Sequence, residues 1–484
     1  MAFLTQAANR GSIPTGYDID GSICLEDAKD QNFVKNYSGD GDRRTWTYST
    51  WVKKGEFGSA NFDYMYMFAA QYTSVHFMNN GLLRVALYNG STTVYADTTQ
   101  VFRDGSAWYN IIVQLDSTQS TASDRVKIWI NGARVTSFNN STYTNMSQNE
   151  QFQIGQASAN YQVGYFFAGG GSNYGFSGYM AETHYVNGTA LDETSFGEFD
   201  SDSGIWKPKE YTGSHGSKGF YLKFTNASNI GEDSATSGIG DFSPNANTTS
   251  ASLAQDSPTN NFATINPLQG NSDKLIISNG ATNIVKSGNH GWQTTNANIA
   301  VSVGKWYAEF KLDTNCTLVM LGVNQADNEA AWYGSHIGAY SNSTAQGMGY
   351  YSQNGYFYRN GGSGAIANTY TAGDIIGIAF CYNSNGTAFM GMSKNGTWQN
   401  SQDPSSGTTG MLGLNYGSAF TNNEMFTFAI STHENTGGVL ANFGGYHNYT
   451  VSSGNTDANG YGNFEYAVPT DYYALCTENL AEFG

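Results

Sequence analysis

The sequence predicts an all-β protein made of two antiparallel β-sandwiches of the jelly-roll kind. Aromatic residues make up 14% of the 484 residues and charged residues only 13%, so the chain carries enough apolar surface to fold. Glycine is abundant, with 58 residues against 7 prolines, and glycine readily adopts the positive φ angles of tight hairpin turns. Short segments alternate between apolar and polar residues, and no long segment has the helical period of 3.6.

The first sandwich is expected over residues 16–226. Residues 43–54, RRTWTYSTWVKK, alternate so that tryptophan, tyrosine and valine side chains share one face of a strand. Residues 124–138 have the pattern of a strand, a reversal and a strand, with Asn131-Gly132 at the reversal. Asn-Gly is the typical pair of a two-residue type I′ turn, which matches the twist of the strands that it joins. This region therefore has the pattern of a sheet built from hairpins.

The second sandwich is expected over residues 274–446. Its segment 386–398, GTAFMGMSKNGTW, repeats the hairpin pattern with Asn395-Gly396 at the turn. Between the two regions, residues 227–273 are rich in serine, asparagine, threonine and glycine and poor in apolar residues. That composition predicts an extended Ser/Asn-rich linker or a long meandering loop.

The two ends of the chain differ in composition. Residues 1–15 form a short N-terminal segment without the long apolar stretch of a signal peptide. Residues 447–484 form an aromatic C-terminal extension. We expect this extension to pack on the protein, because its rings would otherwise make an exposed apolar patch. No apolar run approaches the roughly 20 residues of a membrane span, so no span is expected.

The cysteines and the charge narrow the class of protein. The four cysteines lie far apart and form no C-x-x-C pair, which favours free, mostly buried thiols in a protein made in a reducing cytosol. They are Cys24, Cys316, Cys381 and Cys476. The formal net charge of −17 argues against a nucleic-acid partner, because phosphate binding needs clustered lysine and arginine. The basic pairs Arg43-Arg44 and Lys53-Lys54 are expected on solvated strand faces.

The first region resembles the laminin-G-like, concanavalin A-like family of lectin and glucanase sandwiches. The strand patterns and the Asn-Gly hairpin that carry this resemblance lie in residues 43–55, 105–118, 124–138 and 178–191. Residues 203–224 and 231–245 continue it and resemble segments of large structural proteins of marine bacteriophages. The resemblance covers a little less than half of the chain and implies a two-sheet sandwich.

The second region resembles the SPRY domain. The order Gly-Lys-Trp-Tyr-x-Glu-Phe, Gly-Val, Gly-Asp-x-Ile-Gly and Lys-Asn-Gly carries this resemblance, in residues 303–313, 321–325, 372–398 and 425–432. It covers about a third of the chain and implies a second sandwich with a partner-binding end. The closing segment 466–480 resembles the ends of phage tail and fibre proteins.

The resemblances imply a non-enzymatic protein of the bacteriophage virion surface, made in the host cytoplasm. The leading interpretation is a tail-fibre-like adhesin that binds host-surface glycan or protein through its sandwich loops. The alternative is a structural virion protein, a capsid decoration or tail-assembly subunit that contacts other virion subunits. A homotrimer is expected only because phage adhesins usually assemble in that way. A depolymerase acting on host polysaccharide is a third interpretation.

Two aromatic segments are the candidate binding sites, residues 328–362 and 160–176. Tyrosine and tryptophan offer large, stiff contact surfaces that stack on sugar rings or on a protein partner. The candidates are Trp332, Tyr333, Tyr340, Tyr350, Tyr351, Tyr356 and Tyr358 in the first segment, and Tyr165 and Tyr174 in the second. The alternative is that these rings alternate in ordinary strands and pack the core.

Catalytic and metal sites have weaker patterns. The segment EFDSDSG, with Glu198, Asp200 and Asp202, approaches a glucanase carboxylate motif but lacks its last glutamate, so a solvated acidic loop is expected and no catalytic residue. The histidines have no metal-site spacing, and His184, on a predicted strand, is expected to be structural. No cofactor is expected except a structural calcium ion. Its candidate ligands, which are alternatively turn residues, are Asp18, Asp20, Asp40 and Asp42.

Overall fold

The structure, a computed structural model, describes twelve stretches of the chain. They are residues 16–56, 64–157, 159–167, 173–269, 274–288, 291–313, 316–327, 335–339, 346–359, 361–414, 424–433 and 438–484. The described residues form two compact units. The first unit comprises residues 16–54 and 64–259, and the second comprises residues 55–56 and the described residues from 260 onward.

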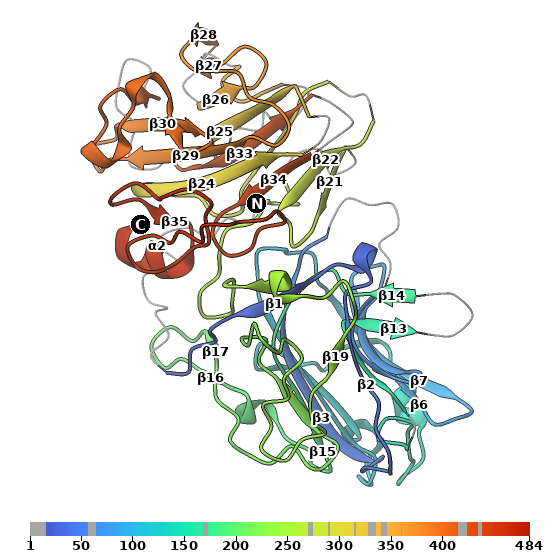
Figure 1. Cartoon of the computed structure of the whole chain (residues 1–484). Helices are drawn as coiled ribbons and strands as arrows, with labels where there is room; N and C mark the ends of the chain where they lie inside the picture. The colour runs from blue at the N-terminus through green and yellow to red at the C-terminus, as the bar shows by residue number, and fades with distance from the viewer. Residues whose placement is uncertain are drawn as a thin grey trace. The chain divides into compact units, whose positions relative to one another are not determined.

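The first unit contains two eight-stranded sheets among its described residues (Figure 1). In order, the first sheet has β10 (Ala133–Arg134), β9 (Val126–Ile130), β8 (Tyr109–Asp116), β3 (Thr45–Lys54), β15 (Gly178–Asn187), β1 (Ser22–Leu25) and β20 (Leu253–Ala254), with β18 (Phe220–Leu222) beside β15. The second has β11 (Phe138–Asn140), β7 (Thr93–Val101), β6 (Leu82–Tyr88), β5 (Thr73–Phe77), β4 (Met65–Ala70), β12 (Tyr161–Val163), β2 (Phe33–Lys35) and β19 (Ser243–Pro244). Two small hairpins accompany them, β13 (Tyr165–Phe167) with β14 (Asn173–Gly175), and β16 (Gly197–Phe199) with β17 (Trp206–Pro208).

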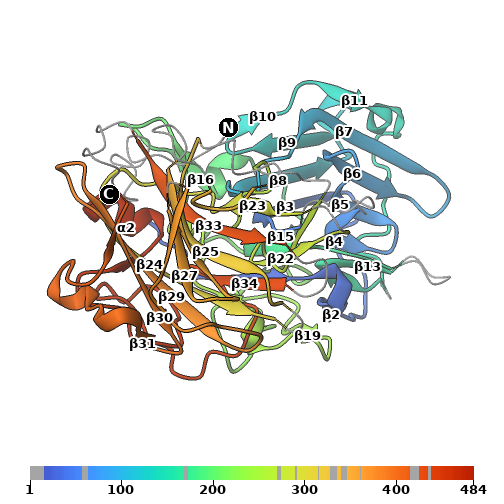
Figure 2. The same ribbon diagram turned by 90° about the horizontal axis from the view of Figure 1, so that it is seen from above.

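The second unit contains a nine-stranded and a six-stranded sheet in its described part, and β24, β29 and β30 lie side by side in both views (Figures 1 and 2). The larger sheet has β21 (Leu275–Ser278), β22 (Asn283–Lys286), β34 (Gly438–Asn442), β24 (Gly304–Leu312), β29 (Ile375–Tyr382), β30 (Ala388–Lys394) and β31 (Thr397–Trp398), with β32 (Leu412–Gly413) beside β30 and β35 (Tyr473–Ala474) beside β24. The smaller has β23 (Gln293–Asn296), β33 (Phe426–Thr432), β25 (Val319–Gln325), β26 (Gly347–Tyr351), β27 (Tyr356–Arg359) and β28 (Gly362–Ala365).

Helices are short wherever the structure describes them. The α-helix α2 (Thr477–Phe483) ends the chain, and the others are 3₁₀ turns. These turns are η1 (Asp27–Lys29), η2 (Ala122–Asp124), η3 (Thr142–Asn145), η4 (Glu193–Ser195), η5 (Ser250–Ser252), η7 (Gln399–Ser401) and η8 (Pro404–Ser406). None of the described helices is long and apolar enough to cross a bilayer. The all-β sandwich prediction is therefore confirmed.

The two Asn-Gly hairpins form as their spacing predicts. In the first unit Asn131 has φ 47° and Gly132 has φ 73°, between β9 and β10. In the second unit Asn395 has φ 48° and Gly396 has φ 77°, between β30 and β31. Two successive positive φ angles define a type I′ turn, and the pair sets the register of the strands on either side.

Each unit has its own apolar core between its two sheets. In β3, Trp46, Tyr48 and Val52 are fully buried in the first core, which confirms that they share the inward face. In the second unit Trp306 and Phe310 of β24 occupy the corresponding inward positions. Alternation along each strand thus separates the core side chains from those on the outer faces.

The segment between the two expected sandwiches packs as part of the first unit up to residue 259. Its strands β19 and β20 add to the edges of the two sheets. Asp256 of this segment forms a buried ion pair with Lys53, with Nζ 2.8 Å from Oδ2, and Trp108 Nε1 donates to Asp256 Oδ1 at 3.0 Å. Residues 227–259 are therefore not an extended linker, because their polar side chains are used in contacts with the sandwich.

The same ion pair corrects the expectation for the basic pair in β3. Lys53 is fully buried and Lys54 is 6% exposed, so neither lies on a solvated face. Lys54 Nζ donates to the Phe102 carbonyl at 3.2 Å, and burial lowers the pKa of Lys54 to about 8. A buried lysine needs such partners, which the local sequence does not reveal because Asp256 lies about 200 residues away.

The C-terminal extension packs on the outer face of the larger sheet of the second unit. Its strand β35 pairs in parallel with β24, and Phe464 and Tyr472 are buried. Glu309 of β24 holds the extension through its carboxylate, which accepts the N–H groups of Glu465 and Tyr466 at 2.9 and 2.8 Å. All four cysteines are buried and none of them is in a disulfide, as the sequence predicts.

Candidate functional site

The outer face of the sheet that contains β6 and β7 carries an ion pair with two parallel hydrogen bonds. Arg84 of β6 donates from Nε and Nη2 to the two carboxylate oxygens of Asp97 of β7, each at 2.7 Å. The two strands place these residues directly opposite each other in the antiparallel register. The Arg84 guanidinium also lies 4.5 Å from the centre of the Tyr95 ring. Register and alternation therefore fix a rigid polar pair on a face turned away from the core.

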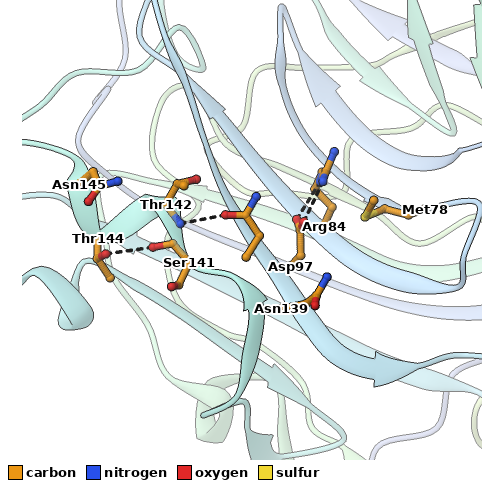
Figure 3. A pocket seen from close by; sticks show the side chains of 9 residues that line it. Met78, Arg84, Asp97, Asn139, Ser141, Thr142, Thr144 and Asn145 are labelled. Carbon is orange, nitrogen blue, oxygen red and sulfur yellow. Dashed lines mark hydrogen bonds and ion pairs between the residues drawn. The ribbon is translucent and has the colours of Figure 1, made fainter.

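This pair lines an open pocket of about 530 Å³ (Figure 3). A pocket of this size is in the range that holds a small ligand. The other side chains come from the turn after β5 and from the continuous segment formed by β11, Ser141 and η3. They are Met78, Asn139, Asn140, Ser141, Thr142, Thr144 and Asn145. Apart from Met78 and the ion pair, the lining consists of neutral amides and hydroxyls.

Part of the lining is committed to holding its own backbone. The Asn140 side chain accepts the Thr142 N–H at 3.1 Å, and the Thr144 hydroxyl donates to the Ser141 carbonyl at 2.9 Å. The Thr142 hydroxyl accepts the Tyr95 N–H at 2.9 Å, which ties the segment to β7. The pocket is thus formed before any ligand arrives, and a preformed site loses less conformational entropy on binding.

Next to the pocket, aromatic side chains form a row across β4 and β5. Tyr66 stacks on His76 with ring centres 4.2 Å apart and on Phe166 at 4.6 Å. Tyr64 lies edge-on to His76 at 5.6 Å and to Tyr174 at 5.7 Å. Burial and the nearby Arg84 lower the pKa of His76 to about 3, so this imidazole is neutral at ordinary pH. Tyr66, His76 and Phe166 are buried and Tyr64 and Tyr174 are half-buried, so the row packs against the sheet beside the pocket and exposes only part of its two outer rings.

The second unit carries a different aromatic group on the outer face of its six-stranded sheet. Trp292 lies edge-on to His336, Tyr351 and His433, at ring-centre distances of 5.3, 5.7 and 5.4 Å. Tyr358 lies 5.2 Å from His336 and 5.7 Å from Tyr351. All five rings are half-buried, so each keeps part of its surface toward solvent.

The structure separates the predicted aromatic residues into several environments. Tyr174 joins the row on the first unit, and Tyr351 and Tyr358 join the Trp292 group. Tyr350 is fully buried in the second core, where its ring is closed to a partner. Tyr165 and Tyr356 are half-buried and stand outside both groups of rings. The candidates Trp332, Tyr333 and Tyr340 lie outside the described residues.

Sequence reasoning missed several members of these sites. The aromatic candidates lie in tyrosine-rich segments. Arg84 and Asp97 lie on two ordinary strands whose sequence has no pattern that indicates a binding site. Trp292 and His433 lie outside both candidate segments and meet His336 only in the sheet. The alternation of β6 and β7 could have placed Arg84 and Asp97 on an outer face, but only the strand register shows that they face each other.

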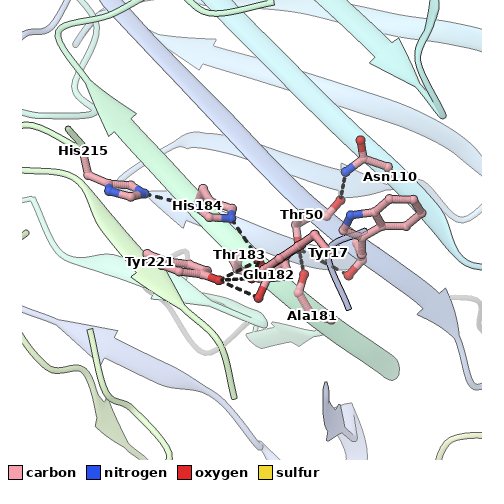
Figure 4. Close-up of polar contacts among 10 residues, drawn as sticks. Tyr17, Thr50, Asn110, Ala181, Glu182, Thr183, His184, His215 and Tyr221 are labelled. Carbon is pink, nitrogen blue, oxygen red and sulfur yellow. Dashed lines mark hydrogen bonds and ion pairs between the residues drawn. The ribbon is translucent and has the colours of Figure 1, made fainter. Parts of the chain in front are cut away.

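A buried polar network lies on the outer face of the other sheet of the first unit (Figure 4). The Tyr221 hydroxyl lies 2.7 Å from both carboxylate oxygens of Glu182, and the Tyr17 hydroxyl donates to the same carboxylate at 2.9 Å. His184 Nδ1 lies 3.1 Å from His215 Nε2, and His184 Nε2 lies 3.5 Å from Glu182. Glu182 has φ 47° at a β-bulge in β15, a conformation that its surroundings must stabilise.

This network is closed to solutes. The side chains of His184 and Glu182 are 5% and 9% exposed, and the rings of Phe196 and Tyr211 lie 5.3 and 6.1 Å from the His184 ring. Burial and the neighbouring His184 lower the pKa of His215 to about 3. Carboxylate and imidazole are groups that can carry out acid–base chemistry, but a substrate has no access to them here. The expected structural role of His184 agrees with this placement.

The carboxylates of the segment that approaches a glucanase motif lie on the β16–β17 hairpin. Lys207 Nζ lies 3.4 Å from Glu198 and 3.5 Å from Asp200. Hydrogen bonds from the Ser203 N–H and hydroxyl lower the pKa of Asp200 to about 2. A carboxyl group that stays ionised at ordinary pH does not donate a proton to a leaving group.

The four aspartates proposed as calcium ligands have other uses or are exposed. Asp42 Oδ1 accepts the N–H groups of Arg44 and Thr45, and Asp40 Oδ1 accepts the Ala157 N–H, as aspartates in turns do. The side chains of the other two, Asp18 and Asp20, are exposed. Across the described ranges, no three side chains of histidine, cysteine, aspartate or glutamate gather where they could share a metal ion. The described carboxylates therefore do not fit a calcium site of that kind.

Comparisons with known proteins give similarity in fold alone. No family model and no curated protein matches the chain. Among solved structures, a human SPRY domain matches 35% of this chain and 94% of its own, at 15% identity and a TM-score of 0.26. The SPRY domain of human HERC1 matches 37% and 96%, at 15% identity and a TM-score of 0.27. A heptameric SAP-like pentraxin from Limulus polyphemus matches 36% and 80%, at 18% identity and a TM-score of 0.26. The sandwich fold itself rests on the sheets described above.

Proposed function

We propose that this chain is a non-enzymatic protein of a bacteriophage virion surface, resembling a tail-fibre adhesin, that binds a glycan or protein on the host surface. The observation that carries the binding role is the open polar pocket beside Arg84 and Asp97. Preformed hydrogen-bonding groups in an open pocket suit recognition of a polar surface ligand. The assignment to a virion rests on the sequence resemblances of residues 203–224, 231–245 and 466–480.

Weak binding at such a pocket would be strengthened by several copies on one particle. An exposed site of this kind makes few contacts, and linked copies raise the overall affinity without any new contact. The expected homotrimer would present three pockets at once. This reasoning favours a function in attachment, where many weak sites meet a repetitive host surface.

A contact with other virion subunits is the second candidate function. The half-buried group of Trp292, Tyr351 and Tyr358 in the second unit favours it, because aromatic rings are enriched where protein surfaces meet. On this proposal the second unit fixes the protein in the virion and the first unit binds the host. The two functions are then complementary rather than exclusive.

The test is binding of the fluorescently labelled full chain to a panel of Gram-positive and Gram-negative bacteria. We expect labelling of at least one strain, and loss of labelling in the triple variant Asn139→Ala, Ser141→Ala and Asn145→Ala. All three side chains are exposed at the pocket, so their removal leaves the core intact. The matched control is Asn36→Ala, an exposed asparagine of the first unit outside the pocket lining and outside both candidate aromatic segments. Equal labelling by wild type and triple variant would refute the assignment of binding to this pocket.

A further inference from the structure

The pocket on the first unit carries no unbalanced charge in its lining. Arg84 is its one cation and Asp97 its one anion, and their side chains are 20% and 3% exposed. Two hydrogen bonds of 2.7 Å make the pair a single neutral unit that is already mostly removed from water. An anionic ligand would meet a guanidinium that Asp97 has neutralised, and it would also meet the Asp97 carboxylate behind it.

The remaining polar groups of the lining can both donate and accept hydrogen bonds. The side chains of Asn139, Ser141 and Asn145 are exposed, and none has a hydrogen-bond partner among the residues that the structure describes. Each amide or hydroxyl offers at least one donor and one acceptor. A sugar hydroxyl has the same double character, whereas a carboxylate or phosphate group only accepts. The free groups therefore match neutral hydroxyls better than anions.

Arg84 adds further donors toward the same space. Its Nε and Nη2 atoms face Asp97, and its Nη1 atom has no partner in the described part of the chain. The Tyr95 ring supports the guanidinium from one side, which holds the free N–H groups in place. The fixed donors of Arg84 beside the exposed amides and hydroxyl of the lining suit a pair of neighbouring hydroxyls, one accepting from arginine and the other bonding to a neutral side chain of the lining.

The net charge of the whole chain also disfavours anionic ligands. With a net charge of −17 the protein repels polyanionic ligands at long range, and the neutral lining supplies nothing local to offset that repulsion. We infer that this pocket selects neutral glycans with adjacent hydroxyls over acidic glycans. The inference rests on the proposed function and adds the chemical class of the ligand.

The test measures binding of defined polysaccharides to the immobilised full chain by biolayer interferometry. The neutral probes are dextran, laminarin, yeast mannan and galactomannan, and the acidic probes are alginate and hyaluronan. We expect at least one neutral probe to bind at least tenfold more tightly than either acidic probe. Raising NaCl from 50 to 500 mM should change this affinity less than twofold, because the contact involves no net charge.

Variants assign the binding to the pocket. The triple variant Asn139→Ala, Ser141→Ala and Asn145→Ala should weaken binding of the neutral probe at least tenfold, while Asn36→Ala should change it less than twofold. Asn145→Lys places an unpaired cation at the rim, and we expect it to strengthen alginate binding at least threefold at 50 mM NaCl. Alginate binding that does not respond to this cation would count against charge balance as the cause of selectivity.

The outcomes separate this inference from the proposed function. If an acidic probe binds tightly and the triple variant abolishes that binding, the inference of a neutral glycan ligand is overturned, while glycan binding at this pocket stands. Attachment to bacteria that the triple variant abolishes, with no polysaccharide bound, would overturn the glycan class and leave host attachment. Neutral-probe binding that the triple variant leaves unchanged would overturn the assignment to this pocket. Absence of both polysaccharide binding and bacterial attachment would overturn both proposals.

Discussion

Replacing Glu309 by alanine should release the C-terminal extension from the second unit. The Glu309 carboxylate is fully buried and accepts four hydrogen bonds. Two come from the N–H groups of Glu465 and Tyr466 at 2.9 and 2.8 Å, and two from the hydroxyls of Tyr307 and Tyr449 at 3.0 and 3.1 Å. Burial raises the pKa of Glu309, and these four donors oppose the shift by stabilising the charged form. The variant removes every one of these contacts at once.

The magnitude follows from the number of donors that lose their partner. An unsatisfied buried donor costs about 1–3 kcal/mol, but water reaches some of the freed groups once the extension loosens. We therefore expect a loss of about 3–5 kcal/mol in the free energy of unfolding of the second unit, similar to breaking a buried ion pair. For a unit of this size that corresponds to a fall of roughly 10 °C in its melting temperature.

Two assays follow the release directly. Hydrogen exchange should accelerate at the amides of Glu465 and Tyr466, because these two N–H groups donate to the lost carboxylate. In limited proteolysis, the first cut in the variant should fall within residues 447–466. The control is Asp471→Asn, which removes an exposed carboxylate near Lys305 on the same unit. Unchanged exchange at both amides, with a melting temperature within 2 °C of wild type, would refute the view that Glu309 holds the extension.

Three further predictions concern the first unit. Asp256→Ala leaves a fully buried lysine without its counter-ion, so urea denaturation should show a loss of about 3–5 kcal/mol. Folding lowers the pKa of His76 from 6.5 to about 3, so between these pH values the unfolded chain binds a proton that the folded chain does not. As the pH is lowered below 6.5, the free energy of unfolding should therefore fall by up to about 1.4 kcal/mol per pH unit. The variant His76→Gln should reduce this pH dependence, measured as the melting temperature at a series of pH values. Gly132→Ala puts a Cβ 2.3 Å from the Trp206 ring at φ 73°, whereas Gly204→Ala at φ 68° meets nothing within 4 Å. The first should therefore lower the melting temperature more than the second, and equal losses would show that backbone strain alone acts.

Local sequence patterns predict much of the fold because hairpins are local structures. Alternation assigns the inward residues of β3, and the Asn131-Gly132 and Asn395-Gly396 pairs mark two turns in which both φ angles are positive. Other Asn-Gly pairs behave differently: at Asn80-Gly81 only the glycine has a positive φ. The dipeptide therefore identifies a reversal reliably, while the turn type depends on the loop around it.

Contacts between distant segments could not be predicted in the same way. Residues 227–259 have the composition of a linker, yet Asp256 is fixed by Lys53 and Trp108. Such a segment needs only a few well-placed polar contacts to become ordered, and composition does not report them. The error about Lys53 has the same cause, since a lysine on an alternating strand appears solvated until its partner is known.

The candidate site shows the same division between local and distant information. The tyrosine-rich segments include Tyr174, Tyr351 and Tyr358, which the structure places half-buried in the two groups of rings. Those segments also include Tyr350, whose position one residue from Tyr351 turns its ring into the core. The ion pair of Arg84 and Asp97 depends on strand register, which the sequence does not specify.

Each unit covers one of its two outer faces with its own later segment. In the second unit the C-terminal extension covers the larger sheet through Glu309, and half-buried rings around Trp292 lie on the smaller one. In the first unit the region around Tyr211 and His215 covers β15, and the polar pocket lies on the sheet that contains β6 and β7. A segment that covers a sheet shields the apolar surface of that face, which would promote aggregation if it were exposed. On the proposed function, recognition uses the other face of each unit, where variants should change binding without changing stability.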